Sequence, residues 1–255
     1  MIMMSMMKYI FMAAKRDKLV LSLFLMMIIS SCMAVFLGSA AVIEKNLFVL
    51  VFSAGILRIV TVLGLVLFVT FYMRRAFDSK EVDYLLSRPI SRVTFIASHV
   101  LSFSIMACFA GGVAGISLYT IAPQSFAEGH LLWIFSLMAE LVIMVNAAFF
   151  FAMVLKSASA SALTCLAFYA LARIMGQIFG ILDVNTGISD WEFINYTMRF
   201  IGMVMPRLDL MGQTSWLIYG IAENSVSAIF IAGQALLCTG LLATASYLDL
   251  FRRQF

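Results

Sequence analysis

The sequence predicts an all-α protein that crosses a membrane with six helices, and three observations predict this class. Hydrophobic residues fill 64% of the 255 positions and charged residues only 12%, whereas soluble domains average about 25% charged residues. Six apolar runs reach about 20 residues, the length that crosses ~30 Å of hydrocarbon as a helix. These runs lack the alternating pattern of membrane β-strands. Helices are therefore the structure that satisfies the backbone in lipid.

Residues 1–18 precede the first run and are rich in methionine. Their apolar side chains recur near one helical face, and their lysines gather toward another. This pattern predicts an amphipathic helix on the inner leaflet, with its cations near anionic headgroups. The alternative is a frayed tail whose basic end only sets the topology. The residues concerned are Met3, Met6, Met7, Ile10 and Phe11 on the first face and Lys8, Lys15 and Lys18 on the second.

The six spans follow in chain order. Several exceed 25 residues, which we attribute to tilt or to extension beyond the bilayer. The first run is too long for the core of a signal peptide, and no small-residue cleavage site follows it. We expect all six helices to form a single transmembrane domain over residues 19–255. The spans cover residues 19–43, 47–73, 93–122, 131–155, 158–182 and 224–250.

The distribution of cations predicts the orientation. Cytoplasmic flanks of membrane helices carry an excess of Lys and Arg. With the N-terminus inside, the outer segments hold only Lys45, Arg199 and Arg207. Both termini are therefore expected in the cytoplasm. The inner flanks hold twelve cations: Lys8, Lys15, Arg16, Lys18, Arg74, Arg75, Lys80, Arg88, Arg92, Lys156, Arg252 and Arg253.

A short charged segment, residues 77–92, separates the second and third spans. Asp78 or Ser79 has the chemistry of a helix cap, and Glu81 lies at capping-box spacing from Asp78. Pro89 ends the helix. We expect a helix over residues 78–88 that lies parallel to the membrane at its cytoplasmic surface. Its apolar face would carry Val82, Leu85 and Leu86, and its polar face Lys80, Asp83 and Arg88.

Three ionisable residues, Arg58, Glu140 and Arg173, fall inside predicted spans. Each lies roughly 15 Å from the outer end of its span at helical rise, near the membrane midplane. A charge there costs at least ~2.5–3.5 kcal/mol. We therefore expect Glu140 to contact Arg58 or Arg173, with the other cation facing a cavity or a partner subunit. Structural pairing without a role in transport is the alternative.

The longest segment between spans, residues 183–223, is expected on the outer face. Ser189 and Glu192 have capping-box spacing, and apolar residues then recur at helical intervals until Pro206. Residues 215–220 add a second short aromatic piece. We expect one or two half-inserted helices over residues 189–222. They would form a lid over a substrate path, or an anchor with tryptophans at headgroup depth.

The sequence predicts neither a metal site nor a catalytic or cofactor site. His99 and His130 fall on opposite sides of the membrane in this topology, and the cysteines lie on different helices without a CxxC pair. A membrane-embedded enzyme would need a cluster of reactive side chains. No basic stripe with interleaved aromatics suggests a nucleic acid. The cysteines, Cys32, Cys108, Cys165 and Cys238, are expected to act as packing residues.

The charged segment resembles a motif of the permease subunits of type-2 ABC (ABC-2) transporters. Members carry a pattern close to Leu-Leu-Ser-x-Pro-Ile-Ser-Arg between their second and third spans, and the six-span layout is similar as well. A Gly-Thr pair common in the family is replaced here by Lys80-Glu81. Residues 205–209 are also similar to a stretch in permeases linked with copper-enzyme maturation. The matching residues are Leu85-Leu86-Ser87-Arg88-Pro89-Ile90-Ser91-Arg92 and Met205-Pro206-Arg207-Leu208-Asp209.

This resemblance implies that residues 78–88 form a coupling helix seated in a groove of a cytoplasmic ABC ATPase dimer. ATP and Mg²⁺ would bind the ATPase, because this chain contains no Gly-x-x-x-x-Gly-Lys-Ser/Thr loop. A second permease copy or a paralogue would complete the pathway in a bacterial inner membrane. Export is the expected direction, with a hydrophobic or amphipathic substrate. The coupling residues would be Asp78, Glu81, Val82, Leu85, Leu86 and Arg88.

Other classes remain open at this point. An ATP-independent secondary transporter or a membrane assembly scaffold is the main alternative. A secondary transporter would be expected to show inverted repeats, and the two halves of this chain show no obvious repeat. An enzyme is the least favoured class, for the reasons given above.

Overall fold

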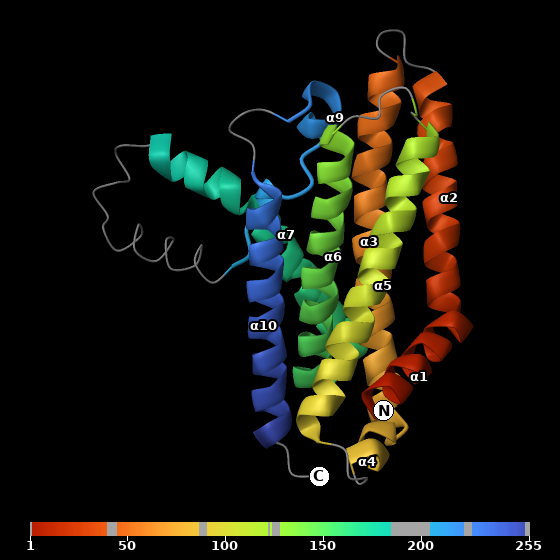
Figure 1. The fold of residues 1–255 in the computed structure, drawn as a ribbon, viewed down its shortest axis with the longest axis vertical. Helices are drawn as coiled ribbons and strands as arrows, with labels where there is room; N and C mark the ends of the chain where they lie inside the picture. The colour runs from red at the N-terminus through yellow and green to blue at the C-terminus, as the bar shows by residue number, and fades with distance from the viewer. Residues whose placement is uncertain are drawn as a thin grey trace.

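The computed structural model describes residues 2–39, 45–86, 91–121, 123, 128–184, 205–221 and 226–252. Every regular element within these residues is helical (Figure 1). The elements are α1 (Ile2–Arg16), α2 (Lys18–Ser39), α3 (Lys45–Asp78), α4 (Glu81–Leu86), α5 (Arg92–Ile121), α6 (Glu128–Val154), α7 (Ala158–Val184), the 3-10 turn η2 (Leu208–Leu210), α9 (Ser215–Tyr219) and α10 (Ala228–Arg252).

Six of these helices, α2, α3, α5, α6, α7 and α10, are long and apolar enough to cross a membrane. They correspond to the six predicted runs, so the fold is that of a multi-pass, all-α membrane protein. The largest difference at the predicted ends is in α3, which continues to Asp78 instead of stopping near residue 73. An ion pair one turn apart, between Arg74 and Asp78 at 2.5 Å, supports these added residues.

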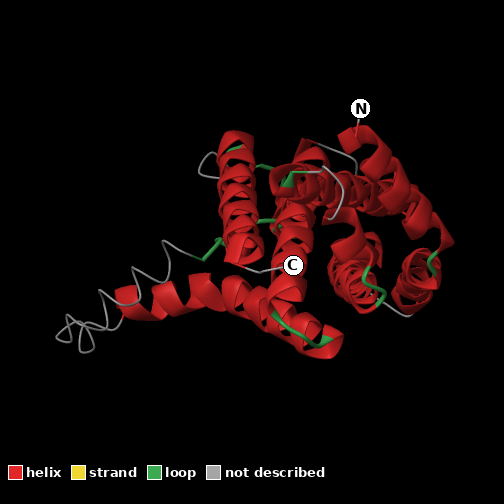
Figure 2. Ribbon diagram, turned by 90° about the horizontal axis from the view of Figure 1, so that it is seen from below, coloured by secondary structure: helices red, strands yellow, loops and turns green. Residues whose placement is uncertain are grey.

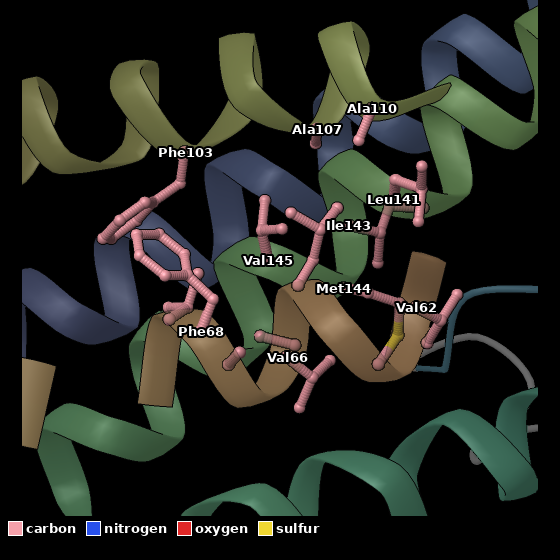
Figure 3. Close-up of a cluster of buried hydrophobic side chains, with 14 of the residues drawn as sticks. Val62, Val66, Phe68, Phe103, Ala107, Ala110, Leu141, Ile143, Met144 and Val145 are labelled. Carbon is pink, nitrogen blue, oxygen red and sulfur yellow. The ribbon is translucent and has the colours of Figure 1, made fainter. Parts of the chain in front are cut away.

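Helix α6 lies at the centre of the bundle and packs against α3, α5, α7 and α10. Figure 3 shows the core between α3, α5 and α6, with Phe68 of α3, Phe103 of α5 and aliphatic side chains of α6. Phe103 also packs on Phe149, with ring centroids 5.8 Å apart. Helix α7 runs at a slant to the others and leaves the bundle at its far end (Figures 1 and 2). The central helix therefore has neighbours on nearly every side.

Two glycines let α5 approach α6 closely. A Cβ atom at Gly111 would come within 2.8 Å of Met138, and one at Gly115 within 2.8 Å of Ile134. A larger residue at either position would therefore force the Met138 or Ile134 side chain to move. This is the small-residue packing at four-residue spacing that is common in membrane bundles.

Residues 2–16 form the continuous helix α1 and not a frayed tail. Met6, Ile10 and Ala14 are buried, and α1 packs against α5 through this face. Asp17 separates α1 from α2, and its Oδ1 accepts a hydrogen bond of 2.8 Å from the Leu19 amide. The amphipathic pattern of the sequence is therefore used to attach α1 to the bundle.

Candidate functional site

Two regions contain the residues that the sequence singles out, and they differ in position. Helix α4 lies at the same end of the bundle as the start of α1, while α9 lies at the opposite end (Figure 1). The three charged residues of the spans lie between these ends.

The turn before α4 differs from the predicted one. Asp78 is the last residue of α3, and α4 begins at Glu81 after the turn Ser79-Lys80. Lys80 adopts φ +56°, in the left-handed region, and its carbonyl accepts the Tyr84 amide at 3.0 Å. The prediction that Asp78 or Ser79 caps this helix in a box with Glu81 is therefore wrong, because Asp78 is held in α3 by its ion pair with Arg74.

The two faces of α4 have different surroundings. Val82 is only 1% exposed and belongs to the hydrophobic core, and Leu85 packs partly buried against that core. Tyr84 points away, with 59% of its surface exposed. Val82 and Leu85 therefore attach α4 to the bundle, and Tyr84 lies on its outward face. The Leu86 side chain and residues 87–90, with Arg88 and Pro89, lie outside the described part of the chain.

Sequence reasoning missed Tyr84, although a signal was available. Tyr84 follows Lys80 by one helical turn and so belongs to the polar face of α4. An aromatic side chain on a face that is otherwise charged is typical of a binding surface. The predicted coupling residues were instead the charged and aliphatic ones, of which Val82 and Leu85 pack inward.

An open surface groove of 590 Å³ lies between α1, α3 and α4. Its charged lining comprises two arginines, Arg16 and Arg75, and three carboxylates, Asp17, Asp78 and Glu81. Asp17 forms an ion pair with Arg75, which joins the α1–α2 corner to the end of α3. These contacts connect the ends of three helices through charged side chains.

Helix α1 also contacts α4 directly. A hydrogen bond to the Glu81 carboxylate, together with burial and the negative charge of Glu81, raises the pKa of Tyr9 above its ordinary value of 10.0. The neutral phenol is the donor in this pair, so the interaction favours the protonated form. The contact links the N-terminal helix to the helix that follows α3.

The second region is a buried charge cluster formed by Arg58 of α3, Glu140 of α6, and Tyr169 and Arg173 of α7. Arg58 Nε lies 3.7 Å from Glu140 Oε2, which is the pairing expected from the sequence. The Tyr169 hydroxyl donates a hydrogen bond of 2.8 Å to Glu140 Oε1. Glu140 is completely buried. Three helices thus bring their polar side chains together inside the bundle.

Helical periodicity explains why these side chains meet. Ser136 and Glu140 are one turn apart on α6, and Tyr169 and Arg173 are one turn apart on α7. Trp133 lies on the same face of α6, and the Arg58 guanidinium lies over its ring at 5.9 Å from the centroid. A cation over an aromatic face is attracted by the ring quadrupole. One face of α6 therefore supplies the carboxylate, the hydroxyl and the aromatic ring.

Residues 205–221 bring backbone groups into the same region. Arg173 Nη1 donates to the carbonyl oxygens of Leu208 and Met211, the second at 2.7 Å. The Gly212 amide donates to Ser136 Oγ at 2.6 Å. Leu208, Met211 and Trp216 are buried. The segment is therefore inserted against the bundle, and Arg173 contacts its backbone. Of the predicted outer helices, only the second short piece is described, as α9, because residues 185–204 lie outside the described part.

The polar groups of the charge cluster are not all satisfied. Arg58 Nε, Arg58 Nη2 and Glu140 Oε2 are buried and have no hydrogen-bond partner. Gly212 has φ +57°, and a Cβ atom there would collide with the Arg58 guanidinium. The inserted segment can therefore approach Arg58 this closely because residue 212 is a glycine.

In both regions, contacts within the chain hold the side chains in place. The α4 region combines an anchored helix with an outward aromatic residue, and the charge cluster combines buried ions with an inserted backbone. The predicted coupling residues and the predicted charge network lie in separate regions. No protein-family model matches the chain, and no curated protein matches it.

Proposed function

We propose that this chain is the membrane-spanning permease subunit of an ABC transporter of the type-2 class. A separate cytoplasmic ATPase would hydrolyse ATP, and a second permease copy or paralogue would complete the pathway. The observation that carries this proposal is α4, a six-residue helix at the end of a long span, anchored inward by Val82 with Tyr84 facing outward. The motif Leu85 to Arg92 supports the same assignment.

The contacts of α4 suit it to transmit force. Glu81 is linked to Tyr9 of α1, and Asp17 of the α1–α2 corner is linked to Arg75 of α3. A load applied to the outward face of α4 would therefore reach three helices at once. Packing transmits such displacement because protein interiors are dense and have few voids. A coupling helix needs this rigid connection.

The positive charges around α4 support an ATPase partner on the cytoplasmic side. Arg74, Arg75 and Lys80 lie around α4, in a region where the sequence predicts a cytoplasmic surface. An ATPase would meet α4 there. The chain also lacks the phosphate-binding loop that nucleotide hydrolysis requires.

Ion-driven secondary transport is the competing function, and the buried Glu140 is the observation that favours it. Ionisable residues inside spans often form ion or proton pathways. Such a protein would transport its substrate with no ATPase attached. The two functions therefore differ in their dependence on a partner.

The test is purification of the tagged chain from native membranes, with the associated proteins identified by mass spectrometry and assayed for ATP hydrolysis. We expect a co-purifying cytoplasmic protein that carries a phosphate-binding loop. Tyr84→Asp should lower its recovery about tenfold or more, because an aromatic residue at the centre of an interface commonly contributes at least ~2 kcal/mol. Leu85→Asp is less informative, because Leu85 also packs against the core.

Tyr219→Asp is the matched control, since Tyr219 is 86% exposed and lies on α9 at the other end of the bundle. Its ATPase recovery should equal that of the unmodified chain. Transport that persists in reconstituted vesicles without an ATPase would contradict the proposal. Equal loss in both tyrosine variants would also contradict it.

A further inference from the structure

We propose that the buried charge cluster is a binding site for the anionic headgroup of an amphipathic substrate, and that residues 205–221 occupy this site in the state described here. This inference rests on the proposed transport function and names the class of cargo. Four features support it: the net charge of the cluster, the carbonyl groups that contact Arg173, the polar groups that the segment covers, and the partly exposed side of the cluster at α7.

The charge balance of the cluster favours an anion. Arg58 and Arg173 contribute two positive charges and Glu140 one negative charge. Tyr169 already donates to Glu140 Oε1, and Arg58 Nε lies 3.7 Å from Glu140 Oε2, too far for a hydrogen bond, whereas Arg58 Nη2 is buried without an acceptor. A buried cation with unused donors is costly unless it is paired. An oxygen atom with negative charge would satisfy these donors.

The inserted segment presents to Arg173 the groups that such a ligand would present. The carbonyl oxygens of Leu208 and Met211 both accept hydrogen bonds from Arg173 Nη1. Two acceptor oxygens on one guanidinium are also what a carboxylate or a phosphate provides. The segment therefore holds Arg173 with neutral oxygens. A charged ligand would form stronger hydrogen bonds with the same nitrogen.

Withdrawal of the segment would leave a set of converging polar groups. Ser136 Oγ accepts the Gly212 amide, and Gly212 lies against the guanidinium of Arg58. Without the segment, Ser136, Arg58 and Arg173 would border the same space. Hydroxyl and guanidinium groups are all donors to anions. The site would thus form when the segment leaves.

The cluster also has an edge that a substrate in the bilayer could reach. Arg58 and Glu140 are buried, whereas Tyr169 and Arg173 of α7 are only partly buried. Exposed apolar residues of α7, such as Leu171 and Ile174, lie beside them. A headgroup could therefore enter at α7 while its tail stays in the hydrocarbon. This arrangement suits an amphipathic anion better than a free inorganic ion.

The test uses the purified chain in dodecyl maltoside, with dioleoylphosphatidic acid as the anionic probe and dioleoylphosphatidylcholine as the zwitterionic control. Native mass spectrometry measures binding, and hydrogen–deuterium exchange follows residues 205–221. We expect phosphatidic acid to bind more tightly and to speed exchange in this segment. Phosphatidylcholine should leave the exchange unchanged.

Substitutions of opposite sign separate binding from folding. Arg173→Gln should weaken phosphatidic acid binding about tenfold or more, because a charge-assisted hydrogen bond is lost. Glu140→Gln keeps the side-chain shape and should strengthen binding, because it removes the competing negative charge. A folding defect would weaken binding in both variants. Lys156→Gln removes an exposed cation between α6 and α7 and should change neither measurement.

Two results would overturn the proposal. One is binding of both lipids with equal affinity, and the other is binding by Arg173→Gln and Glu140→Gln at the level of the unmodified chain. Unchanged exchange in residues 205–221 on addition of phosphatidic acid would place the lipid elsewhere and would also overturn it. Because no ATPase takes part, these results do not depend on the co-purification test. A chain without an ATPase partner could still show this site.

Discussion

Gly212 shows how one residue determines the approach of a loop to a buried charge. Its φ is +57°, a conformation that residues with a side chain adopt only at a cost. The guanidinium of Arg58 also fills the space that a Cβ atom of this residue would need. Gly220 shares the first property, with φ +74°, but a Cβ atom there would meet no atom within 4 Å. Both glycines therefore have a backbone conformation that disfavours a side chain, and only Gly212 also lies against Arg58.

Gly212→Ala is predicted to destabilise the protein more than Gly220→Ala. Gly212→Ala places a side chain at positive φ, at ~1–2 kcal/mol, and Gly220→Ala places one at φ +74° and ψ −166°, a region essentially restricted to glycine, at ~1–3 kcal/mol. Gly212→Ala should cost a further ~1–3 kcal/mol, because the methyl group overlaps Arg58. Denaturant unfolding in detergent measures the difference. A loss of stability in Gly212→Ala that is no larger than in Gly220→Ala would contradict this prediction.

At the residue scale, a pairing of Glu140 with Arg58 or Arg173 could be predicted because all three charges lie at similar depth in apolar spans, and the structure pairs Glu140 with Arg58. The partner of Arg173 could not be predicted. Its acceptors are the backbone carbonyls of Leu208 and Met211. Because every residue has a backbone carbonyl, the sequence does not indicate which carbonyl groups an arginine will contact.

At the scale of elements, α1 and α4 are connected by a proton-dependent contact. Burial and Glu81 raise the pKa of Tyr9, so the folded protein favours the neutral phenol. The stabilising effect of this contact is fully present below the ordinary tyrosine pKa of 10.0 and is lost as the pH rises through the higher pKa of the folded state. The link between α1 and α4 is therefore intact at neutral pH.

Tyr9 is predicted to titrate above pH 10.0 and to do so because of Glu81. In ¹³C-tyrosine-labelled protein, the ring resonance that disappears in Tyr9→Phe identifies the residue. Glu81→Gln should lower its pKa toward the ordinary value, since the charge and the strongest acceptor are removed. A pKa that is the same in Glu81→Gln and in the unmodified chain would contradict the contact.

The helices themselves were predictable, because about 20 apolar residues admit few structures in a membrane. The start of α4 was not. Asp78 has the chemistry of a helix cap, but it also lies four residues after Arg74, and the ion pair within α3 prevails. The Asp78 side chain could either cap α4 or form an ion pair with Arg74, and its position in the sequence is compatible with both.

At the scale of the whole molecule, the spans were predictable and their arrangement was not. Helix α2 has the highest mean hydropathy of the six, 2.5, yet only 22% of its apolar window is buried, against 72% for α6. Lipid and neighbouring helices are both apolar, so hydropathy does not distinguish them. The polar residues Glu140 and Asn146 mark α6 as the central helix, since such residues face the bundle interior.

The expected orientation places α4 in the cytoplasm and α9 on the outer face. A membrane-impermeant maleimide should therefore label Tyr219→Cys in intact cells and label Ser79→Cys only in inverted vesicles. The unmodified chain is the control, because its four cysteines lie within the long helices. Labelling of both variants from the same side would contradict this topology.

The left-handed conformation of Lys80 has a mechanical consequence. A residue other than glycine costs about 1–2 kcal/mol in this region, so the corner between α3 and α4 rests above its local energy minimum. The backbone of Lys80 is also bonded on both sides, because its amide donates to the Phe77 carbonyl and its carbonyl accepts the Tyr84 amide. The conformation of this one residue therefore sets the direction of α4 against the end of α3, and the burial of Val82 keeps α4 in that direction.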